Sequence, residues 1–152
     1  MGDWVFEQPE KNVSTILEGI KEEASGTQIN YVDVGWNMRA LDSAKIEEAI
    51  QTAKSSDLAI VIVGEDSFRQ HWKEKTCGEN RDRMDITLWG KQDYLVESIY
   101  KTGVPTIVIL INGRPLATRW IAENIPAVIE AWEPGSMGGK AIAVSYTHLT
   151  LP

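Results

Sequence analysis

A run of apolar, mostly β-branched residues at 59–63 constrains the fold of this chain more than any other feature. The sequence Ala-Ile-Val-Ile-Val does not alternate polar with apolar side chains, which is typical of a strand buried on both faces of a parallel sheet. Residues 106–111 (Thr-Ile-Val-Ile-Leu-Ile) and 127–131 (Ala-Val-Ile-Glu-Ala) predict two further strands of this kind. Such strands need helices on both faces of the sheet to cover them.

Segments with helical spacing separate these strands. Apolar residues at 13, 16, 17 and 20 define one face of a helix over 13–24, with Asn12 or Ser14 as its cap. Helices are also expected at 45–54, 90–101, 115–123 and from about 140, and residues 28–34 alternate with period two, which predicts another strand. The order predicts an α/β three-layer sandwich with a mainly parallel sheet, in a flavodoxin-like arrangement.

Charge and composition exclude several classes of partner. The chain has 152 residues, one domain's worth, and a formal charge of -7 from 15 basic and 22 acidic side chains. This charge repels phosphate backbones and anionic lipid, and no apolar run approaches the roughly 20 residues that cross a bilayer. We therefore expect neither nucleic acid nor a membrane as a partner. Cys77 is the only cysteine, so no disulfide forms within the chain, and the compartment stays open.

Three loops follow the strands, at residues 64–85, 112–115 and 132–135, and parallel strands gather such loops at one edge of the sheet. The first places Glu65 directly after the buried run and then carries Trp72, Glu79 and Arg83. Acid, aromatic and arginine side chains together suit a sugar better than a nucleotide. The Asn-Gly and Pro-Gly pairs of the other two loops are expected to be turn chemistry. His71 is expected to be a polar loop residue and not a metal ligand, because no second His or Cys stands at ligand spacing.

Four linked motifs resemble those of the C-terminal α/β sandwich domain of glycoside hydrolase family 3. They are Val-Gly-Glu at 63–65, Gly-Glu-Asn-Arg-Asp-Arg-Met-Asp-Ile-Thr-Leu at 78–88 with Gln92, Asn-Gly-Arg-Pro-Leu at 112–116, and Ala-Trp-Glu-Pro-Gly-Ser-Met-Gly-Gly-Lys-Ala-Ile-Ala at 131–143. The resemblance covers residues 2 to about 143. The motif forms are most similar to those of bacterial β-glucosidases, although xylosidases and exo-glucanases share the scaffold.

The resemblance implies a retaining, exo-acting β-glycosidase, most similar to a β-glucosidase, that hydrolyses β-linked glucosides or oligosaccharides without a cofactor. It implies that an N-terminal barrel domain, which would precede Met1, carries an Asp nucleophile, so the present chain alone is expected to be inactive. It also implies that Glu65 is the general acid/base. In a retaining enzyme the two carboxyl groups lie about 5 to 5.5 Å apart.

The resemblance implies roles for four further residues. Glu79 is the main competitor of Glu65, in a loop that walls the substrate pocket. Glu79 and Arg83 either contact the sugar or join an ion-pair network that orders the loop. Trp4 matches a position that stacks on the departing sugar, or is a core residue at the domain entrance, and Trp72 is expected to wall the aglycone side. The remaining tryptophans are expected to be packing residues: Trp36, Trp89, Trp120 and Trp132.

Residues 144–152 do not match the family, so we expect the domain at 1–143, truncated at its C-terminus, and a tail that is not native. One alternative is a nucleotide-binding α/β module, in which the glycines of 135–139 hold a phosphate at a helix N-terminus, although the full fingerprint spacing is absent. The other is a non-catalytic carbohydrate-binding module.

Overall fold

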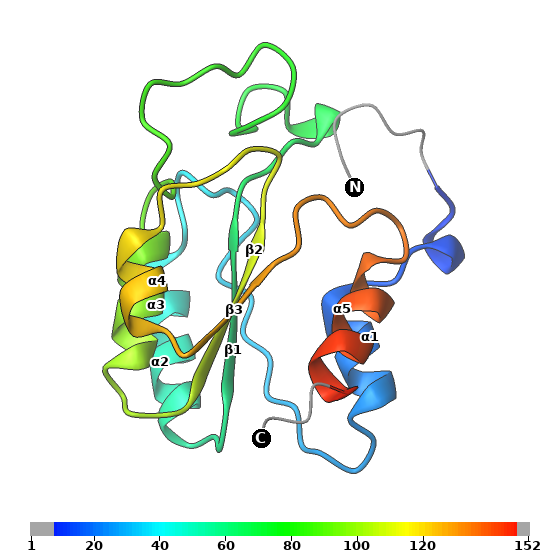
Figure 1. The fold of residues 1–152 in the computed structure, drawn as a ribbon, viewed down its shortest axis with the longest axis vertical. Helices are drawn as coiled ribbons and strands as arrows, with labels where there is room; N and C mark the ends of the chain where they lie inside the picture. The colour runs from blue at the N-terminus through cyan, green and yellow to red at the C-terminus, as the bar shows by residue number, and fades with distance from the viewer. Residues whose placement is uncertain (1–7, 149–152) are drawn as a thin grey trace.

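The computed structural model describes residues 8–148 and contains one parallel sheet (Figure 1). Its strand order is β1-β2-β3, and Gly64 at the end of β1 pairs with Ile111 at the end of β2. The strands therefore end at the same edge, and the three predicted strands are confirmed. Their predicted burial on both faces is wrong in part, because Ile62 is 43% exposed and Val128 is 41% exposed. Their bounds are β1 (Ala59–Gly64), β2 (Thr106–Ile111) and β3 (Ala127–Glu130).

Helices cover the sheet on two sides. Figure 1 shows α2, α3 and α4 against one face and the pair α1 and α5 on the other, which makes three layers. The predicted α/β sandwich is confirmed. No helix within residues 8–148 has the length and apolarity needed to cross a bilayer. The bounds are α1 (Ile16–Glu23), α2 (Ser43–Lys54), α3 (Gln92–Tyr100), α4 (Arg119–Asn124) and α5 (Gly138–His148), with short 3-10 turns η1 (Glu10–Asn12) and η2 (Arg69–His71).

The core lies between the sheet and α2, α3 and α4. Alternate residues of β1 and β2 point into it, and the apolar faces of the helices close it. The predicted periodicity of 45–54 is confirmed, because Ile46 and Ile50 are buried on one face of α2. Asp42 caps α2 by accepting from the N–H groups of Ala44 and Lys45. The best-buried residues of this core are Ile46, Val61, Val63, Leu95, Val96, Val108, Leu110 and Ile121.

Helix α1 begins later than predicted. Its cap is Thr15, not Asn12 or Ser14, because Thr15 and Glu18 form a reciprocal capping box: the Thr15 hydroxyl accepts from the Glu18 N–H, and the Glu18 carboxylate accepts from the Thr15 N–H. The predicted helix after residue 139 begins at Gly138 and continues to His148. The assignment of residues 144–152 to a non-native tail stays a prediction, and 149–152 lie outside the described residues.

Two glycines bring α1 and α5 together. A Cβ on Gly139 would lie 2.1 Å from the carbonyl oxygen of Thr15, and one on Gly19 would lie 2.4 Å from that of Gly139. The Gly139 N–H donates to the carbonyl of Ser14 at 3.1 Å. These glycines therefore serve helix packing, and an N–H group that a phosphate would need already has an acceptor.

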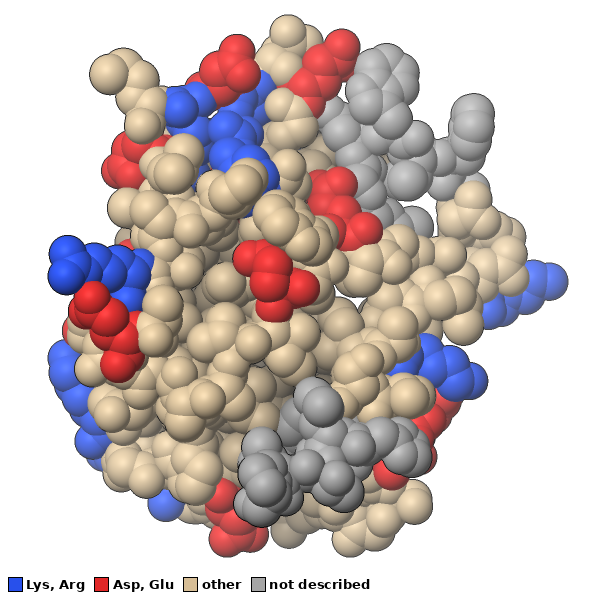
Figure 2. Space-filling model, in the orientation of Figure 1, with Lys and Arg blue, Asp and Glu red and all other residues tan. Residues whose placement is uncertain are grey.

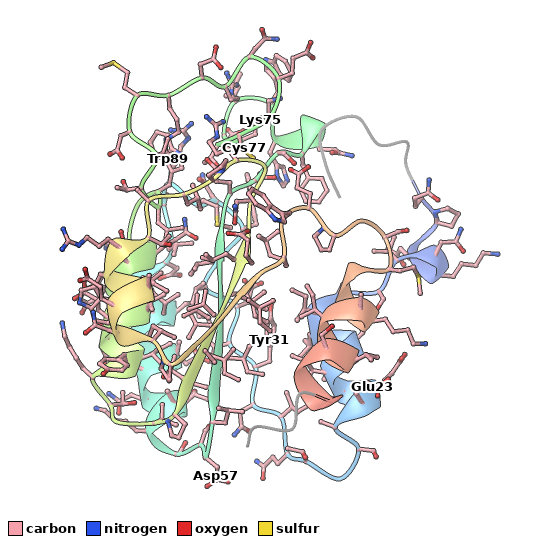
Figure 3. All side chains as sticks on the ribbon, in the orientation of Figure 1. Glu23, Tyr31, Asp57, Lys75, Cys77 and Trp89 are labelled. Atoms are coloured by element: carbon pink, nitrogen blue, oxygen red, sulfur yellow. The ribbon has the colours of Figure 1, made fainter. Side chains whose placement is uncertain are left out.

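The prediction of a strand at 28–34 is wrong. The segment runs beside β1 without pairing to it and helps line a cavity of about 350 Å³ with β1 and α2. Tyr31, labelled in Figure 3, is 61% exposed. Alternation of polar and apolar side chains indicates which residues face water. A strand also needs hydrogen bonds to the backbone of a neighbouring strand, and the local sequence does not show whether such a neighbour exists.

Candidate active site

The loops after the three strands meet at the carboxyl edge of the sheet, at the top of Figure 1. The longest connects β1 to α3 and carries Lys75, Cys77 and Trp89, which Figure 3 labels at this end of the molecule. Acidic and basic side chains gather at the same end in Figure 2. This edge is where open α/β sheets hold their ligands.

A glycine and a glutamine fix the start of the long loop. Gly64 has φ 148°, and a Cβ there would lie 1.8 Å from the carbonyl oxygen of Ile111, so only glycine fits. The Gly64 N–H donates to Oε1 of Gln92 at 2.7 Å, and Nε2 of Gln92 donates back to the Gly64 carbonyl at 2.9 Å. The next N–H, that of Glu65, donates to Ile111 at 2.7 Å. These bonds set the direction in which Glu65 leaves the strand.

The Glu65 carboxylate is enclosed between two arginines. Its side chain is 0% exposed, with Oε1 lying 3.3 Å from Nη1 of Arg83 and Oε2 lying 3.3 Å from Nε of Arg114. Oε2 nevertheless has no hydrogen bond of good geometry within the described residues. Burial raises the pKa of Glu65, and the charges of Arg114 and Arg83 oppose the rise. The Glu65 carboxylate thus connects two loops, because Arg83 and Arg114 come from different loops and both contact it. We refer to Glu65 with these two contacts as the Glu65 centre.

Cys77 is a buried thiol close to the charge of Glu65. The residue is 1% exposed. Burial, followed by the charge of Glu65, raises the pKa of Cys77 to about 12. Cys77 is therefore a protonated structural thiol, not a nucleophile.

Arg83, which pairs with Glu65, also lies against the aromatic ring of Trp89. The guanidinium carbon of Arg83 lies 4.3 Å from the centre of the Trp89 ring, and that of Arg39 lies 3.8 Å from it. Nη2 of Arg83 also donates to the carbonyl of Thr87 at 2.6 Å. Trp89 is a packing residue, as expected, but the groups packed on it are two cations. Arg83 thus forms an ion pair, with Glu65, while its role toward a sugar stays a prediction.

Arg114 was missed by sequence reasoning. Its loop was expected to be a turn only, yet Nη2 of Arg114 donates to the carbonyl of Arg81 at 2.6 Å, in addition to the ion pair with Glu65. Asn112 holds the Arg114 carbonyl with its Nδ2 at 2.8 Å. The signal was an arginine three residues after the end of a buried strand, at the predicted edge of the sheet. No sequence pattern showed which group its side chain would contact.

Two other candidate residues, Glu79 and Trp72, are exposed on the loop. Trp72 is 43% exposed, and its ring lies 4.3 Å from Nζ of the buried Lys75. Trp4 falls outside the described residues. The structure thus brings Arg83 to Glu65 and leaves Glu79 and Trp72 at the surface of the loop.

Two tryptophans contradict their assignment to packing. Trp36 is 52% exposed and Trp132 is 47% exposed. Trp120 does pack, with its ring 5.5 Å from that of Tyr100 and against the core. His71 pairs through Nδ1 with Oδ2 of Asp66 at 2.6 Å, and residues 8–148 hold no cluster of three metal-ligating side chains.

Known proteins resemble this chain over nearly its whole length. The C-terminal domain of glycosyl hydrolase family 3 matches residues 1–145. A β-xylosidase from Formosa agariphila is 43% identical over 130 residues, which are 85% of this chain and 17% of that protein. A β-glucosidase structure from Erythrobacter marinus has a TM-score of 0.68 at 30% identity, over 87% of this chain and 21% of that one. A Listeria innocua β-glucosidase in complex with isofagomine, at 24% identity, matches the fold with a TM-score of 0.77, over 99% of this chain and 19% of that one.

Proposed function

The chain belongs to glycosyl hydrolase family 3, whose C-terminal domain it represents, and from this premise we propose that it supplies the general acid/base of a retaining β-glycosidase. The chain spans 17% and 21% of the relatives named above from Formosa and Erythrobacter, so the rest of such an enzyme lies outside it. The proposed substrate is a β-linked glucoside, xyloside or short oligosaccharide, cleaved from its end. A barrel domain contributes the nucleophilic Asp.

The observation that carries the proposal is a loop with exposed acid and aromatic groups on a rigid frame at the carboxyl edge. The frame is the Glu65 centre with Arg83 and Arg114, and the exposed groups include Glu79 and Trp72. A site of this kind holds reactive groups still while it leaves them open to a partner surface. Neutral sugars also suit a chain of charge -7 better than anions do.

Glu65 and Glu79 differ in access. A proton donor must come within about 2.6–3.2 Å of the leaving oxygen. The Glu65 side chain is 0% exposed and lies between two cations, so a sugar reaches it only if Arg83 or Arg114 moves away. Glu79 is exposed. We therefore assign proton transfer to Glu79 and give Glu65, the residue expected from the sequence, the role of positioning the loop through Arg83.

The test compares Glu79→Gln with Glu65→Gln in the full-length protein. Glu79→Gln should lower kcat/KM on a disaccharide by about 10² to 10⁴, because general acid assistance has this size. A dinitrophenyl glycoside needs no proton for departure, so its first step should change little. Azide should restore turnover of that substrate in Glu79→Gln, because it replaces the water that the missing base no longer activates.

Glu65→Gln serves as the matched comparison. A positioning residue should affect both substrates alike and gain nothing from azide. If Glu65→Gln instead shows the leaving-group dependence and the azide rescue, Glu65 is the acid/base. If neither variant shows them, this domain does not supply the acid/base.

The two alternatives have separate readouts. If the domain is a carbohydrate-binding module without catalysis, glucose or its lactone should change the tryptophan fluorescence, and the full-length protein should hydrolyse none of the substrates. A nucleotide module would be stabilised against heat by phosphates. The Gly139 N–H already donates to Ser14, which favours the glycosidase over the nucleotide module.

A further inference from the structure

The turn that carries Glu79 has an unusual backbone. Glu79 lies between Gly78, with φ 89°, and Asn80, with φ 58°, so both of its neighbours are in the left-handed region. This region is less favourable for Asn than for Gly, and a residue stays there only where the surrounding structure holds it. The contacts that hold this turn therefore decide where the Glu79 carboxylate lies.

The turn is anchored before Glu79 at Cys77. This residue is 1% exposed and is labelled in Figure 3 at the loop end of the molecule. Its N–H donates to the carbonyl of Asp66 at 3.2 Å, and a Cβ on Gly113 would lie 3.3 Å from its sulfur. Cys77 is thus packed against the loop that follows β2.

The turn is anchored after Glu79 at Arg81, by Arg114. Nη2 of Arg114 donates to the carbonyl of Arg81 at 2.6 Å. Gly113 and Arg114 are neighbours, so the loop after β2 supports the turn at both of its ends. Glu79 lies midway between Cys77 and Arg81 in the sequence, and it is exposed.

Arg114 is itself held in one orientation. Its Nε lies 3.3 Å from Oε2 of Glu65, and its side chain is 22% exposed. Its carbonyl accepts from Nδ2 of Asn112 at 2.8 Å, and the N–H of Asn112 donates to the carbonyl of Trp132 at 3.2 Å. A planar guanidinium that meets a carboxylate with one nitrogen and a carbonyl with another has a fixed direction. Glu65 thus sets the direction in which Arg114 holds the turn.

We propose that Arg114 is a positioning residue, which places the Glu79 carboxyl group for proton transfer through its bond to the Arg81 carbonyl. This inference rests on the proposed function, in which Glu79 protonates the leaving oxygen. Proton transfer needs a separation of about 2.6–3.2 Å, so a shift of the turn by about 1 Å takes the carboxyl group out of range. Arg114 acts through Glu79 and transfers no proton itself, because a guanidinium stays charged.

The experiment uses the full-length protein with Arg114→Lys, Arg114→Ala and, as control, Arg119→Ala, which removes an arginine whose side chain is 89% exposed on α4. Lysine keeps a positive charge beside Glu65, but its single ammonium does not reproduce the planar fork that meets both partners. On a disaccharide, both Arg114 variants should lower kcat about tenfold to hundredfold with little change in KM, the size expected for a misplaced catalytic group. The burst of dinitrophenol from a dinitrophenyl glycoside should keep its rate, and Arg119→Ala should keep both rates.

A double variant tests whether Arg114 acts through Glu79. If it does, Glu79→Gln with Arg114→Lys should be no slower on the disaccharide than Glu79→Gln alone, because the group that Arg114 positions is already gone. Losses that multiply would overturn the inference. Equal losses by Arg114→Lys on both substrates, or no loss on either, would also overturn it, and equal losses would make Arg114 a structural residue.

Hydrogen exchange separates failure of this inference from failure of the proposed function. The amides of residues 78–80 should exchange about tenfold faster in Arg114→Lys than in the parent protein, and at the parent rate in Arg119→Ala. If Glu79→Gln shows no dependence on the leaving group while exchange is faster in Arg114→Lys, the placement of Glu79 by Arg114 stands and the catalytic proposal falls. If exchange in Arg114→Lys does not change, the inference falls, whichever residue donates the proton.

Discussion

Replacing Gly64 with alanine should destabilise the fold more than replacing any of the exposed glycines. The added Cβ would lie 1.8 Å from the Ile111 carbonyl oxygen and 2.7 Å from its carbonyl carbon, both backbone atoms. Only a separation of β1 from β2 at this point relieves the overlap. Separation breaks the bond from Glu65 to Ile111 and the two bonds between Gly64 and Gln92.

The magnitude follows from a matched control. Gly103 also has a positive φ, of 83°, but a Cβ there meets nothing within 4 Å. Gly103→Ala should therefore cost only the backbone strain, about 1–2 kcal/mol, partly offset by the lower entropy of the unfolded chain. Gly64→Ala carries comparable strain and loses three buried hydrogen bonds at about 1 kcal/mol each, so it should cost about 3 kcal/mol more than the control.

Urea unfolding of the chain, followed by tryptophan fluorescence, measures the difference. With a slope of about 2 kcal/mol per M, the midpoint of Gly64→Ala should lie roughly 1.5 M below that of Gly103→Ala. Equal midpoints would refute the reasoning, because they would mean that the strand ends part without cost. A Gly64→Ala chain that does not fold, beside a folded Gly103→Ala chain, agrees with it.

Three further outcomes are expected. Cys77 should resist alkylation at pH 8 in the folded chain and react once urea is added, because the residue is 1% exposed and its thiol has a pKa of about 12. Rapid labelling of the folded chain would contradict the burial of Cys77 beside Glu65. Burial raises the pKa of Glu65 above its ordinary 4.5, so its contribution to the free energy of unfolding is complete below that pH and declines as the pH rises through the pKa of the folded state. The urea midpoint of the parent chain should therefore fall between about pH 4 and 8, and that of Glu65→Gln should lack this decline. Midpoints of the two chains that change with pH in parallel would contradict the expectation. Trp89→Ala should destabilise the chain by about 2 kcal/mol in urea and Trp89→Phe by less than about 1, because a phenyl ring still lies between the two guanidinium groups; equal losses would show that Arg39 and Arg83 contribute nothing.

The sequence predicted the parts of the fold that depend on which side chains avoid water. The apolar runs at 59–63 and 106–111 became adjacent strands, and the periodicity of 45–54 placed Ile46 and Ile50 in the core. The strand expected at 28–34 failed because pairing depends on a partner's backbone, which a local pattern does not contain. The cap of α1 moved to Thr15 because three neighbouring polar residues compete and Glu18 reaches only one of them.

The site was predictable in its place and less so in its contacts. The position of Glu65 at the end of β1 follows from the apolar run, but its enclosure by Arg83 and Arg114 depends on long side chains that cross between loops. Flexible side chains of this kind carry little positional information in sequence. The exposed stack of Trp36 on His71 was missed for the same reason, because tryptophan composition predicts burial and these residues come together only in the folded chain.

The paired amide of Gln92 means that the long loop begins and ends at one point. The hydrogen bonds between Gly64 and Gln92 close the loop at its base, and residues 65–91 lie between these two residues. Doubling the length of a flexible closed loop costs only about 0.6 kcal/mol of closure entropy. Residues can thus be inserted or exchanged in the loop while β1 and α3, which it connects, keep their positions. This attachment allows the loop to change in length and sequence without rebuilding the sheet.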